Sequence, residues 1–468
     1  MDKEALIAYF NGAAATRDRW RKRNWYYHKA LETLAQFLIP SNQSVLEIGC
    51  GTGELLMAIK PSRGVGVDIS PAMIAQSQEK YPQYEWRVDD AENLKVGERF
   101  DYVIASDLIG YVDDIEEVFY NLNRVCHPRT RVVITHYNHL WEPVLRLAER
   151  LGLKAKQPLQ NWMSGADIEN MLELAGFEVV KRGKRMICPF WIPLLSNLIN
   201  RYVGQLPLLS RLGVIQYYVA RQVPQDARDY SVSVVIPCRN ECGNIENAVK
   251  RVPQFGTYME LIFVEKGSTD GTLEEIKRVA SAYAGKKNIR WFEGDIDSKR
   301  DKVRLAFAKA KGDILMILDA DLTMPPEDLP KFYRAIASGR GEFINGSRLV
   351  YPMEKEAMRF LNMLANKFFS LMFTWLLGQR IKDTLCGTKV IFRKDYEVLA
   401  ANRAYFGDFD PFGDFDLLFG AAKLNLKIVE LPVRYRARTY GKTNIHRWRH
   451  GWILLTMVAF AMRKIKFI

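Results

Sequence analysis

Two short motifs, each directly after an apolar run, lie in different halves of this chain. The run Val45–Ile48 leads into GCGTG at 49–53, and the run Ile314–Leu318 leads into DAD at 319–321. In open α/β sheets ligands bind where the strands end, so each motif marks a site in a sheet of its own. The 468 residues also exceed the size of a typical single core. The sequence therefore predicts two α/β domains with separate sites.

The boundary between these domains is predicted at the polar segment RQVPQDARDY, residues 221–230. It separates an apolar region at about 187–220, which we expect to be a helical extension of the first domain, from the strand-like run Val232–Ile236. We therefore expect a first domain over residues 1–222, a linker over 223–230 and a second domain over 231–468.

The net charge of +13 and the pI of about 9.3 favour an anionic partner. The sequence carries no RNA-binding motif, and its basic residues adjoin apolar stretches. We therefore expect phosphorylated substrates and an anionic membrane surface rather than nucleic acid. Six cysteines without a CxxC pair disfavour zinc and a disulfide framework and suit a reducing cytosol.

The longest apolar runs, 368–377 and 452–462, are shorter than the roughly 18 residues expected of a membrane-spanning helix. The polar opening MDKEALIAYF leads us to expect no signal peptide. We therefore expect a cytoplasmic protein that is peripheral on the cytoplasmic face of the membrane.

Acidic residues follow the later strand-like runs of the N-terminal half. These pairs are Gly64–Val67 with Asp68, Tyr84–Val88 with Asp89, Asp90 and Ala91, and Tyr102–Ala105 with Ser106 and Asp107. A carboxylate at the tip of the second strand suits a ribose diol, and glycines let the backbone approach a ligand closely. The alternative is that Asp68 and Asp90 merely cap helices.

Residues 31–180 resemble the class I S-adenosylmethionine-dependent methyltransferases, which have a Rossmann-like doubly wound sheet. The resemblance implies that S-adenosylmethionine is the cofactor, held by the glycine turn, by the acid after the second strand and by the acid of the DA pair. The cofactor-binding residues expected on this basis are Glu47, Gly49, Gly51, Gly53, Asp68, Asp90 and Ala91. Cys50 is expected to be a small packed residue, since no His or second Cys adjoins it.

The methyl-acceptor side of this domain offers three candidates. His136, Tyr137 and His139 follow the strand-like run Arg131–Thr135, where substrate groups often lie in this fold; a structural role is the alternative for each. The apolar segment 187–219 has two interpretations, a packed cap on this domain or an interfacial segment that touches lipid.

Three motifs follow in order in the C-terminal half: SVVIPCRNE at 233–241 with its preceding residues, FVEKGSTDGT at 263–272 and ILDADL at 317–322. Two aspartates at i and i+2 after a strand can aim at one hard divalent cation, which prefers carboxylate oxygens. The alternative is that Asp319 and Asp321 are solvated turn residues.

Residues 230–438 resemble glycosyltransferase family 2, which has the GT-A fold and inverts the transferred sugar. The resemblance implies a nucleotide-sugar donor and Mg²⁺ or Mn²⁺ held by Asp319 and Asp321, which are also catalytic. The donor-binding residues expected are Pro237, Arg239, Asn240, Glu241, Glu265, Gly267, Ser268, Asp319, Ala320 and Asp321. Lys266 stands where the family usually has an acid, so UDP and GDP both stay open as the nucleotide.

The stretch from 413 to 445 resembles the tail of polyprenyl-phosphate sugar transferases such as the dolichol-phosphate-mannose synthases. The resemblance implies a lipid-linked or phosphate acceptor met by the basic cluster Arg434, Arg436, Arg438 and Lys442. Asp414 and Asp416 are the remaining catalytic candidates. A hydroxyl acceptor would need one of them as a base, whereas a phosphate acceptor would need none.

Two apolar helices are predicted near the end of the chain. In 357–377 a single polar stripe is made by Arg359, Asn362, Asn366, Ser370 and Thr374. Basic residues flank 452–462, as expected for contact with anionic headgroups. Each helix is therefore either buried in the core or laid against lipid.

The motifs together predict a bifunctional enzyme, a sugar transferase joined to a methyltransferase that acts in the same glycan or lipid pathway. One alternative is a glycosyltransferase whose methyltransferase-like domain binds a ligand without catalysis. Another is a nucleotidyltransferase with the GT-A fold, which the resemblance of the tail argues against.

Overall fold

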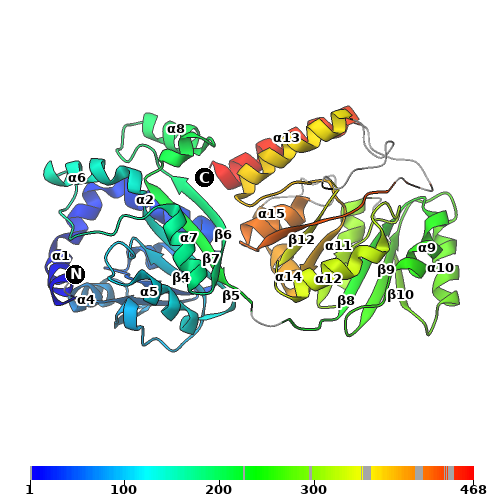
Figure 1. The fold of residues 1–468 in the computed structure, drawn as a ribbon, viewed down its shortest axis with the longest axis horizontal. Helices are drawn as coiled ribbons and strands as arrows, with labels where there is room; N and C mark the ends of the chain where they lie inside the picture. Colours follow the sequence, from blue (N-terminus) through cyan, green and yellow to red (C-terminus); the bar gives the residue numbers. More distant parts are fainter. Residues whose placement is uncertain are drawn as a thin grey trace. The chain divides into compact units, whose positions relative to one another are not determined.

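The computed structural model describes residues 3–224, 227–294, 298–348, 350, 360–405, 415–436, 438, 440 and 447–467, with the side chains of 360–366 and 447–451 left aside. The chain divides into two compact units. Unit 1 comprises Met1–Val223 with Lys466–Ile468, and unit 2 comprises Pro224–Ile465. Each unit contains one seven-stranded sheet, and Figure 1 shows helices on the faces of both.

The sheet of unit 1 is parallel over five strands and antiparallel at its last two pairings. Its strands, in spatial order, are β3 (Glu85–Val88), β2 (Arg63–Asp68), β1 (Ser44–Ile48), β4 (Phe100–Ser106), β5 (Cys126–Tyr137), β7 (Ile215–Gln222) and β6 (Phe177–Arg185). The order reverses at β1, whose neighbours are β2 and β4, and such a reversal opens a crevice at the carboxyl ends of the strands. Its core is formed by fully buried side chains such as Leu46, Val65 and Val103.

The helices of unit 1 connect these strands and cover the sheet. They are α1 (Lys3–Arg23), α2 (Trp25–Leu38), α3 (Glu54–Ile59), α4 (Pro71–Lys80), α5 (Ile115–Leu122), α6 (Glu142–Arg150), α7 (Gly165–Leu174) and α8 (Leu195–Arg201). Ser70 caps α4 by accepting the Met73 amide, and Asp114 caps α5 by accepting the Glu117 amide. Each cap lies on the connection from a strand to the next helix, so it fixes the residue at which that helix begins.

The expectation of a helical extension over 187–220 was wrong for its last part. Ile215–Gln222 is strand β7, which lies between β5 and β6 and pairs antiparallel with both. Nearly every residue of this strand is buried on both faces of the sheet, so it lacks the alternation of a half-buried strand. Its β-branched and aromatic content, IQYYV, was the available signal. Only α8 and two short 3₁₀ turns, Val203–Gln205 and Leu209–Leu212, are helical in this segment.

The sheet of unit 2 is mixed. Its strands, in spatial order, are β10 (Asn288–Glu293), β9 (Met259–Glu265), β8 (Val232–Cys238), β11 (Ile314–Ile317), β13 (Lys389–Phe392), β12 (Phe343–Ser347) and β14 (Ile428–Pro432). The first four are parallel, and β13 runs antiparallel to both its neighbours. Motif-bearing loops after β8, β9 and β11 therefore leave the same edge of the sheet.

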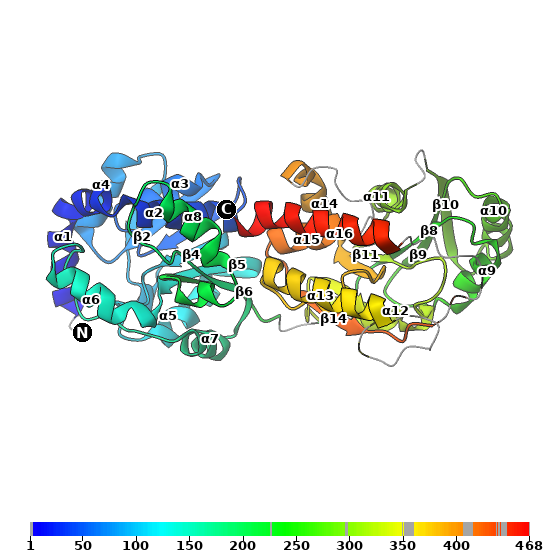
Figure 2. The same ribbon diagram turned by 90° about the horizontal axis from the view of Figure 1, so that it is seen from above.

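The helices of unit 2 include two long apolar ones near the end of the chain. The set is α9 (Cys242–Arg251), α10 (Thr272–Ala282), α11 (Lys299–Lys309), α12 (Leu329–Ala337), α13 (Phe360–Leu377), α14 (Arg393–Ala401), α15 (Phe415–Lys423) and α16 (Arg447–Ala461). In both views α13 and α16 run side by side (Figure 1, Figure 2). Among the described residues, neither these nor any other helix has the length and apolar character needed to cross a bilayer.

The structure describes the side chains of only part of the predicted polar stripe of α13. Ser370 and Thr374 turn their hydroxyls to the carbonyl of Ile381, at 2.6 and 3.1 Å. Arg359, Asn362 and Asn366 lie outside the described side chains. The stripe thus serves the turn after the helix, while Phe368 and Leu371 are 50% and 66% exposed on another side.

Candidate active sites

The glycine turn of unit 1 joins β1 to α3. Gly49, Gly51 and Gly53 have φ angles of 74°, 53° and 84°, which residues with a Cβ rarely adopt. The amides of Gly49 and Cys50 donate to the carbonyl of Val67 at 2.8 and 3.0 Å. The turn is therefore fastened to the end of β2, where Asp68 lies.

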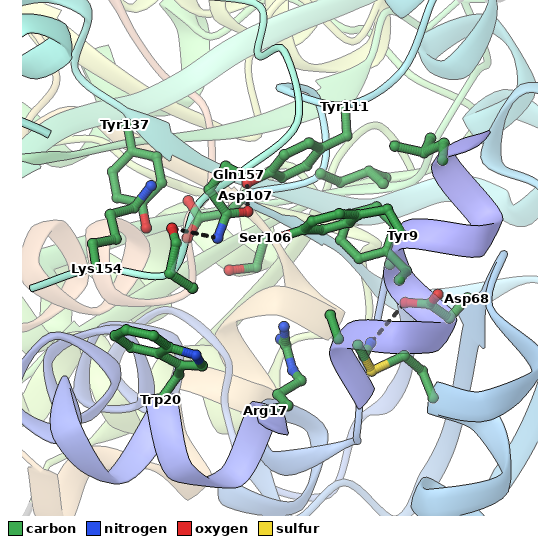
Figure 3. Close-up of a pocket in the computed structure, with 18 of the residues that line it drawn as sticks. Tyr9, Arg17, Trp20, Asp68, Ser106, Asp107, Tyr111, Tyr137, Lys154 and Gln157 are labelled. Atoms are coloured by element: carbon green, nitrogen blue, oxygen red, sulfur yellow. Dashed lines mark hydrogen bonds between the residues drawn. The ribbon is translucent and has the colours of Figure 1, made fainter. Parts of the chain in front are cut away.

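A cavity of about 600 Å³ lies beside this turn (Figure 3). Five predicted cofactor residues line it: Gly49, Gly51, Asp68, Asp90 and Ala91. Glu47 and Gly53 are not among its described lining residues. Glu47 is buried and accepts the amide of Leu56 at 3.0 Å, and a Cβ on Gly53 would lie 2.4 Å from the Trp86 ring. These two residues shape the turn rather than the wall of the cavity.

Asp68 is held by two backbone amides. Its Oδ2 accepts the Gly51 amide at 2.8 Å, and its Oδ1 accepts the Ser70 amide at 2.9 Å. Burial raises the pKa of Asp68 above its usual value, and these amides offset only part of that effect. Asp90 differs, since Lys3 of α1 lies 2.6 Å from its carboxylate.

A second carboxylate of the cavity, Asp107, follows β4. Its φ of 53° is uncommon for a residue with a Cβ. Its Oδ2 accepts the Tyr27 hydroxyl at 2.8 Å, and its Oδ1 is buried without a hydrogen-bond partner among the described residues. Burial raises the pKa of Asp107. A strained, desolvated carboxylate in a cavity is a candidate proton acceptor.

Of the three candidates on the acceptor side, only Tyr137 is among the described lining residues. Its ring stacks on Tyr27, with the centroids 5.4 Å apart. His136 is 2% exposed, and burial lowers its pKa to about 4. His136 is thus a neutral packed side chain at pH 7, which fits the structural alternative; His139 is likewise absent from the described lining.

Helix α1 supplies cavity residues that no sequence motif marks. Tyr9, Arg17 and Trp20 line the cavity, and Figure 3 shows Arg17 pointing into it. Nη2 of Arg17 lies 2.7 Å from the position that a Cβ on Gly51 would take. A guanidinium here suits a ligand carboxylate. The only signal in the sequence was their spacing, which puts all three on one face of a helix.

In unit 2, the loops after β8 and β9 are joined to each other. The Asn240 amide donates to Ser268 Oγ at 3.0 Å, and the Thr269 amide donates to Asn240 Oδ1 at 2.8 Å. Glu265, at the end of β9, accepts the Ser268 amide at 2.8 Å. Asn240 and Gly267 have positive φ angles of 54° and 77°. Pro237 and Arg239 lie at the same end of β8, so the donor residues predicted from separate motifs form one structure.

The DAD triplet follows β11, next to β8. Arg438 links two acids there, since its Nη1 lies 3.0 Å from Glu241 and its Nη2 lies 2.7 Å from Asp321. Lys299, the first residue of α11, lies 2.8 Å from Asp319. Ala320 is buried between the two aspartates. The structure therefore brings the predicted acids together and adds Lys299, which no motif marked.

The surroundings of Asp319 are strongly cationic and tightly packed. Burial pushes the pKa of Asp319 upward, but Lys299, Lys389 and Arg348 outweigh it and hold the pKa below its usual value. A Cβ on Gly387 would lie 1.9 Å from Asp319 Oδ2. A side chain at this position would displace the carboxylate, so the segment around 386–388 packs closely against it.

The acceptor-side candidates are only partly described. Asp416, the second residue of α15, lies 3.1 Å from Nη2 of Arg304 and 3.7 Å from Nε of Arg403. Arg434 and Arg436 are exposed, whereas Arg438 faces the donor-side acids. Asp414 and Lys442 lie outside the described residues.

Comparison with known proteins fits both sites. Residues 19–182 match the family described as "Methyltransferase domain", and residues 233–399 match "Glycosyl transferase family 2". A dolichol-phosphate mannosyltransferase of Pyrococcus furiosus is 30% identical over 247 residues, which are 50% of this chain and 67% of that protein. The chain joins a methyltransferase domain to a family 2 glycosyltransferase domain.

Two further matches show how far each likeness extends. An undecaprenyl-phosphate 4-deoxy-4-formamido-L-arabinose transferase of Aeromonas hydrophila is 36% identical over 112 residues, covering 23% of this chain and 34% of its own. The solved magnesium protoporphyrin IX methyltransferase of Synechocystis is 18% identical, with a TM-score of 0.34, and covers 47% of this chain and 100% of its own. The glycosyltransferase half thus spans about two thirds of the archaeal relative and about a third of the bacterial one.

A divalent cation, which the DAD triplet of the glycosyltransferase domain implies, can be compared with the side chains present. Among the described residues no group of three or more His, Cys, Asp or Glu side chains is placed to hold a metal. Two carboxylates, Asp319 and Asp321, nevertheless fit Mg²⁺ when substrate phosphates complete the coordination. These two carboxylates therefore suit a cation that the nucleotide phosphates also coordinate, rather than one coordinated by protein side chains alone.

Proposed function

We propose that the C-terminal half transfers a sugar from a nucleotide-sugar donor to a polyprenyl phosphate or another lipid-linked acceptor. The observation that carries this proposal is the convergence of Glu241, Asp319 and Asp321 with Lys299 and Arg438 at one end of the sheet. A nucleoside diphosphate needs positive charges beside its phosphates and hydrogen-bond acceptors beside its nucleoside, and this cluster offers both.

The joined loops after β8 and β9 would hold the nucleoside, with Glu265 and Asn240 as its polar neighbours. The diphosphate would lie toward Asp319 and Asp321, where Mg²⁺ or Mn²⁺ would be held by these two carboxylates. A cation there supplies charge neutralisation at the leaving phosphates. Lys299 and Arg438 are close enough to exchange their carboxylate partners for phosphate oxygens, and both UDP and GDP fit this arrangement.

The ion pairs of Asp416 favour a phosphate acceptor. Arg304 and Arg403 lie beside Asp416, and these cations suit the charge of a phosphate. A phosphate is already an anion and attacks without a base, so Arg304 and Asp416 would position the acceptor rather than deprotonate it. The exposed Arg434 and Arg436 suit its charge.

The exposed face of α13 and α16 supports attachment to an anionic membrane. Phe368, Leu371 and Trp452 are 50%, 66% and 69% exposed, although a soluble helix normally buries such side chains. Basic residues follow α16, with Arg463 exposed. We propose that the protein is peripheral on the cytoplasmic face of the membrane, where this apolar face meets lipid and the basic residues meet headgroups.

For the N-terminal half we propose S-adenosylmethionine-dependent methyl transfer. Asp68 would accept the ribose hydroxyls, Arg17 would meet the cofactor's carboxylate, and Asp90 with Ala91 would face its adenine. The bound cofactor supplies an electrophilic methyl group on sulfur. If the acceptor is a hydroxyl, Asp107 would take its proton when the methyl group is transferred to its oxygen.

We propose that both halves act in one glycan or lipid pathway, since one chain carries both sites. Purified protein with a panel of nucleotide sugars and polyprenyl phosphate should release nucleoside diphosphate with one donor, and calorimetry should show S-adenosylmethionine binding. If no donor is consumed with any acceptor in a membrane extract, the sugar-transfer proposal fails. Sugar transfer without any S-adenosylmethionine binding would instead identify a methyltransferase-like domain that does not catalyse.

Attachment to membranes can be measured by flotation with liposomes. We expect binding to vesicles that contain phosphatidylglycerol, with less bound as salt screens the headgroups. Replacing Phe368 and Leu371 with glutamate should lower the bound fraction, whereas Val398→Glu, at a singly exposed apolar residue of α14, should not. Recovery of the wild type in the soluble fraction at low salt with anionic vesicles present would refute the proposal.

A further inference from the structure

Helix α6 of unit 1 presents an apolar stripe to solvent. Leu140, Val144, Leu147 and Leu151 recur at steps of three and four residues and are 53%, 46%, 53% and 64% exposed. All residues of α6 are described, and none of them is buried. A surface helix normally packs such a stripe against the protein core. On α6 the stripe faces solvent instead.

The segment between β6 and β7 adds a second exposed apolar group. Phe190, Trp191, Ile192, Leu194, Leu195 and Leu198 are all at least 42% exposed, with Leu194 at 88%. Three of them belong to or adjoin α8, which has a single buried residue, Ser196, in its fully described length. We call these six residues, together with the four of the α6 stripe, the apolar rim.

Hydrogen bonds join the two segments that carry the two parts of the apolar rim. Nε1 of Trp141, at the start of α6, donates to the carbonyl of Leu212 at 2.7 Å. The Asn138 side chain donates to the carbonyls of Arg211 and Gly213 at 3.1 and 2.9 Å. In Figure 1, α6 and α8 both lie on the upper side of unit 1. The rim is therefore part of a built surface rather than of a free loop.

Aromatic side chains with polar tips border the apolar rim. The ring of Trp191 lies 5.2 Å from that of Trp25 and 5.2 Å from that of Tyr26. The Tyr26 hydroxyl contacts the Asn197 side chain at 3.2 Å and the Asn200 side chain at 3.0 Å. Tryptophan and tyrosine with one apolar and one polar end are typical of the boundary between lipid and water.

In the segment between β6 and β7, the only charged residues are basic, Arg201 and Arg211. Helix α6 carries two acids as well, and both are paired with cations, Glu142 with Arg146 and Glu149 with Lys154. Arg201 and Arg211 are both exposed. An exposed apolar face among cations complements anionic lipid, because the side chains enter the acyl region while the cations meet the headgroups.

The apolar rim also reaches the methyltransferase cavity. Val144 and Phe190 belong to the rim, are exposed, and line the cavity at the same time. Leu145, Leu153 and Val214 add to this apolar lining, whereas Asp107 and Tyr137 line the same cavity with polar groups. The cavity thus has an apolar entrance at the rim and polar groups within.

From this arrangement we infer that the methyltransferase unit docks on an anionic bilayer through the apolar rim, and that its methyl acceptor is a lipid-anchored molecule that enters the cavity from the membrane. This inference rests on the proposed methyltransferase function. It adds a second membrane contact, separate from α13 and α16. It also describes the methyl acceptor as a molecule with an apolar anchor, which lies against Phe190 and Val144, and a polar group, which reaches Asp107.

The inference can be tested with a local probe on the full chain. In a Cys188→Ser, Cys242→Ser background, which removes the two cysteines that are not buried, a nitroxide is placed at Leu194→Cys. A matched label at Leu174→Cys reports from another exposed leucine of unit 1, 63% exposed on α7. With phosphatidylglycerol–phosphatidylcholine vesicles, position 194 should become protected from a water-soluble relaxation agent and accessible to oxygen, and position 174 should not change.

Function is tested with Leu194→Glu/Leu198→Glu and the control Leu174→Glu. The double variant should reduce methyl incorporation into lipid-extractable material from a membrane extract by about tenfold or more, since two leucine anchors are lost. Its affinity for S-adenosylmethionine should stay that of the wild type. The Leu174→Glu control should match the wild type in both measurements.

The outcomes separate this inference from the function on which it rests. A label at 194 that stays accessible to water with vesicles present overturns it, and so does methylation confined to water-soluble molecules. A label already protected without vesicles would show that protein covers the rim, and a concentration-dependent dimer abolished by the double variant would identify a second copy. Vesicle protection without S-adenosylmethionine binding would leave the membrane contact standing and refute the methyltransferase function.

Discussion

The two sites of this chain hold their carboxylates in opposite ways. In unit 1, Glu47 and Asp68 accept backbone amides and Asp107 accepts a tyrosine hydroxyl. In unit 2 the carboxylates meet cations, as Asp319 does with Lys299, Asp321 with Arg438 and Asp416 with Arg304. The deep acids of one site therefore accept hydrogen bonds from neutral donors, whereas those of the other site are in ion pairs.

This difference reverses the direction in which the acids shift. Burial raises the pKa of Glu47, Asp68 and Asp107 because it disfavours the charged form, and neutral donors together with nearby cations such as Arg17 offset only part of that effect. For Asp319 burial acts in the same way, but the cations outweigh it and the pKa falls. The acids of unit 1 suit a ligand with hydroxyl donors and a cationic sulfonium. The ion pairs of unit 2 suit a ligand whose phosphates replace the carboxylates as partners of Lys299 and Arg438.

The largest effect is expected from Glu47, whose pKa burial raises from 4.5 to about 8. The folded state then binds a proton that the unfolded state releases, so the free energy of unfolding of unit 1 should fall as pH rises from about 4.5 to 8. The fall is about 5 kcal/mol at most. Glu47→Gln should remove it, and other titrating groups cancel when the wild type and the variant are compared.

Urea unfolding of the full chain at several pH values, followed by pulsed hydrogen exchange on peptides of β1 and β4, measures this difference. Glu116→Gln, at an exposed position of α5, is the control and should follow the wild type. Parallel curves for the wild type and Glu47→Gln would show that Glu47 is not desolvated as described.

The next effect concerns Asp319 and Asp321. Asp319→Ala and Asp321→Ala should each lower sugar transfer by about 10²- to 10³-fold, or roughly 3–4 kcal/mol, since the leaving phosphates lose their cation site. Asp328→Ala, at an acid paired with Lys331 beyond the triplet, should keep activity, and S-adenosylmethionine binding should persist in all three. Full transfer in EDTA by the protein lacking both aspartates would rule out the proposed role.

A smaller loss is expected at Asp68. Asp68→Ala should weaken S-adenosylmethionine binding by about 1–3 kcal/mol in calorimetry, because charge-assisted hydrogen bonds to the ribose are removed. Since its pKa is raised, binding should also weaken on acidification at a higher pH than an ordinary aspartate would give. Unchanged affinity in the variant would place the ribose elsewhere, and no binding by the wild type would favour the non-catalytic alternative.

The smallest effect is expected at Asp416 if the acceptor is a phosphate. Asp416→Asn should then cost less than about tenfold in transfer to polyprenyl phosphate, because no proton has to be removed. A loss of about 10²-fold or more with the same acceptor would contradict this and indicate a base that acts on a hydroxyl. Steady-state rates with polyprenyl phosphate and with a glycolipid extract distinguish the two.

The sequence by itself determined the two families and most of the site. Strand-end motifs carry this information because parallel strands end at one edge, so Gly51, Asp68 and Asp319 could be placed without coordinates. In the structure the amide of Gly51 donates to Asp68, so these two predicted residues lie beside each other. Local spacing also predicted that α13 and α16 are too apolar for ordinary surface helices.

Only the tertiary structure decided which distant side chains meet. Arg17 reaches Gly51 from another helix, and Lys299 and Arg438 reach the DAD triplet from opposite sides in sequence. It also decided that Ile215–Gln222 completes a sheet and that the stripe of α6 faces outward. Periodicity shows that a segment has an apolar face, but what covers that face depends on contacts between residues far apart in the chain, and these no local pattern encodes.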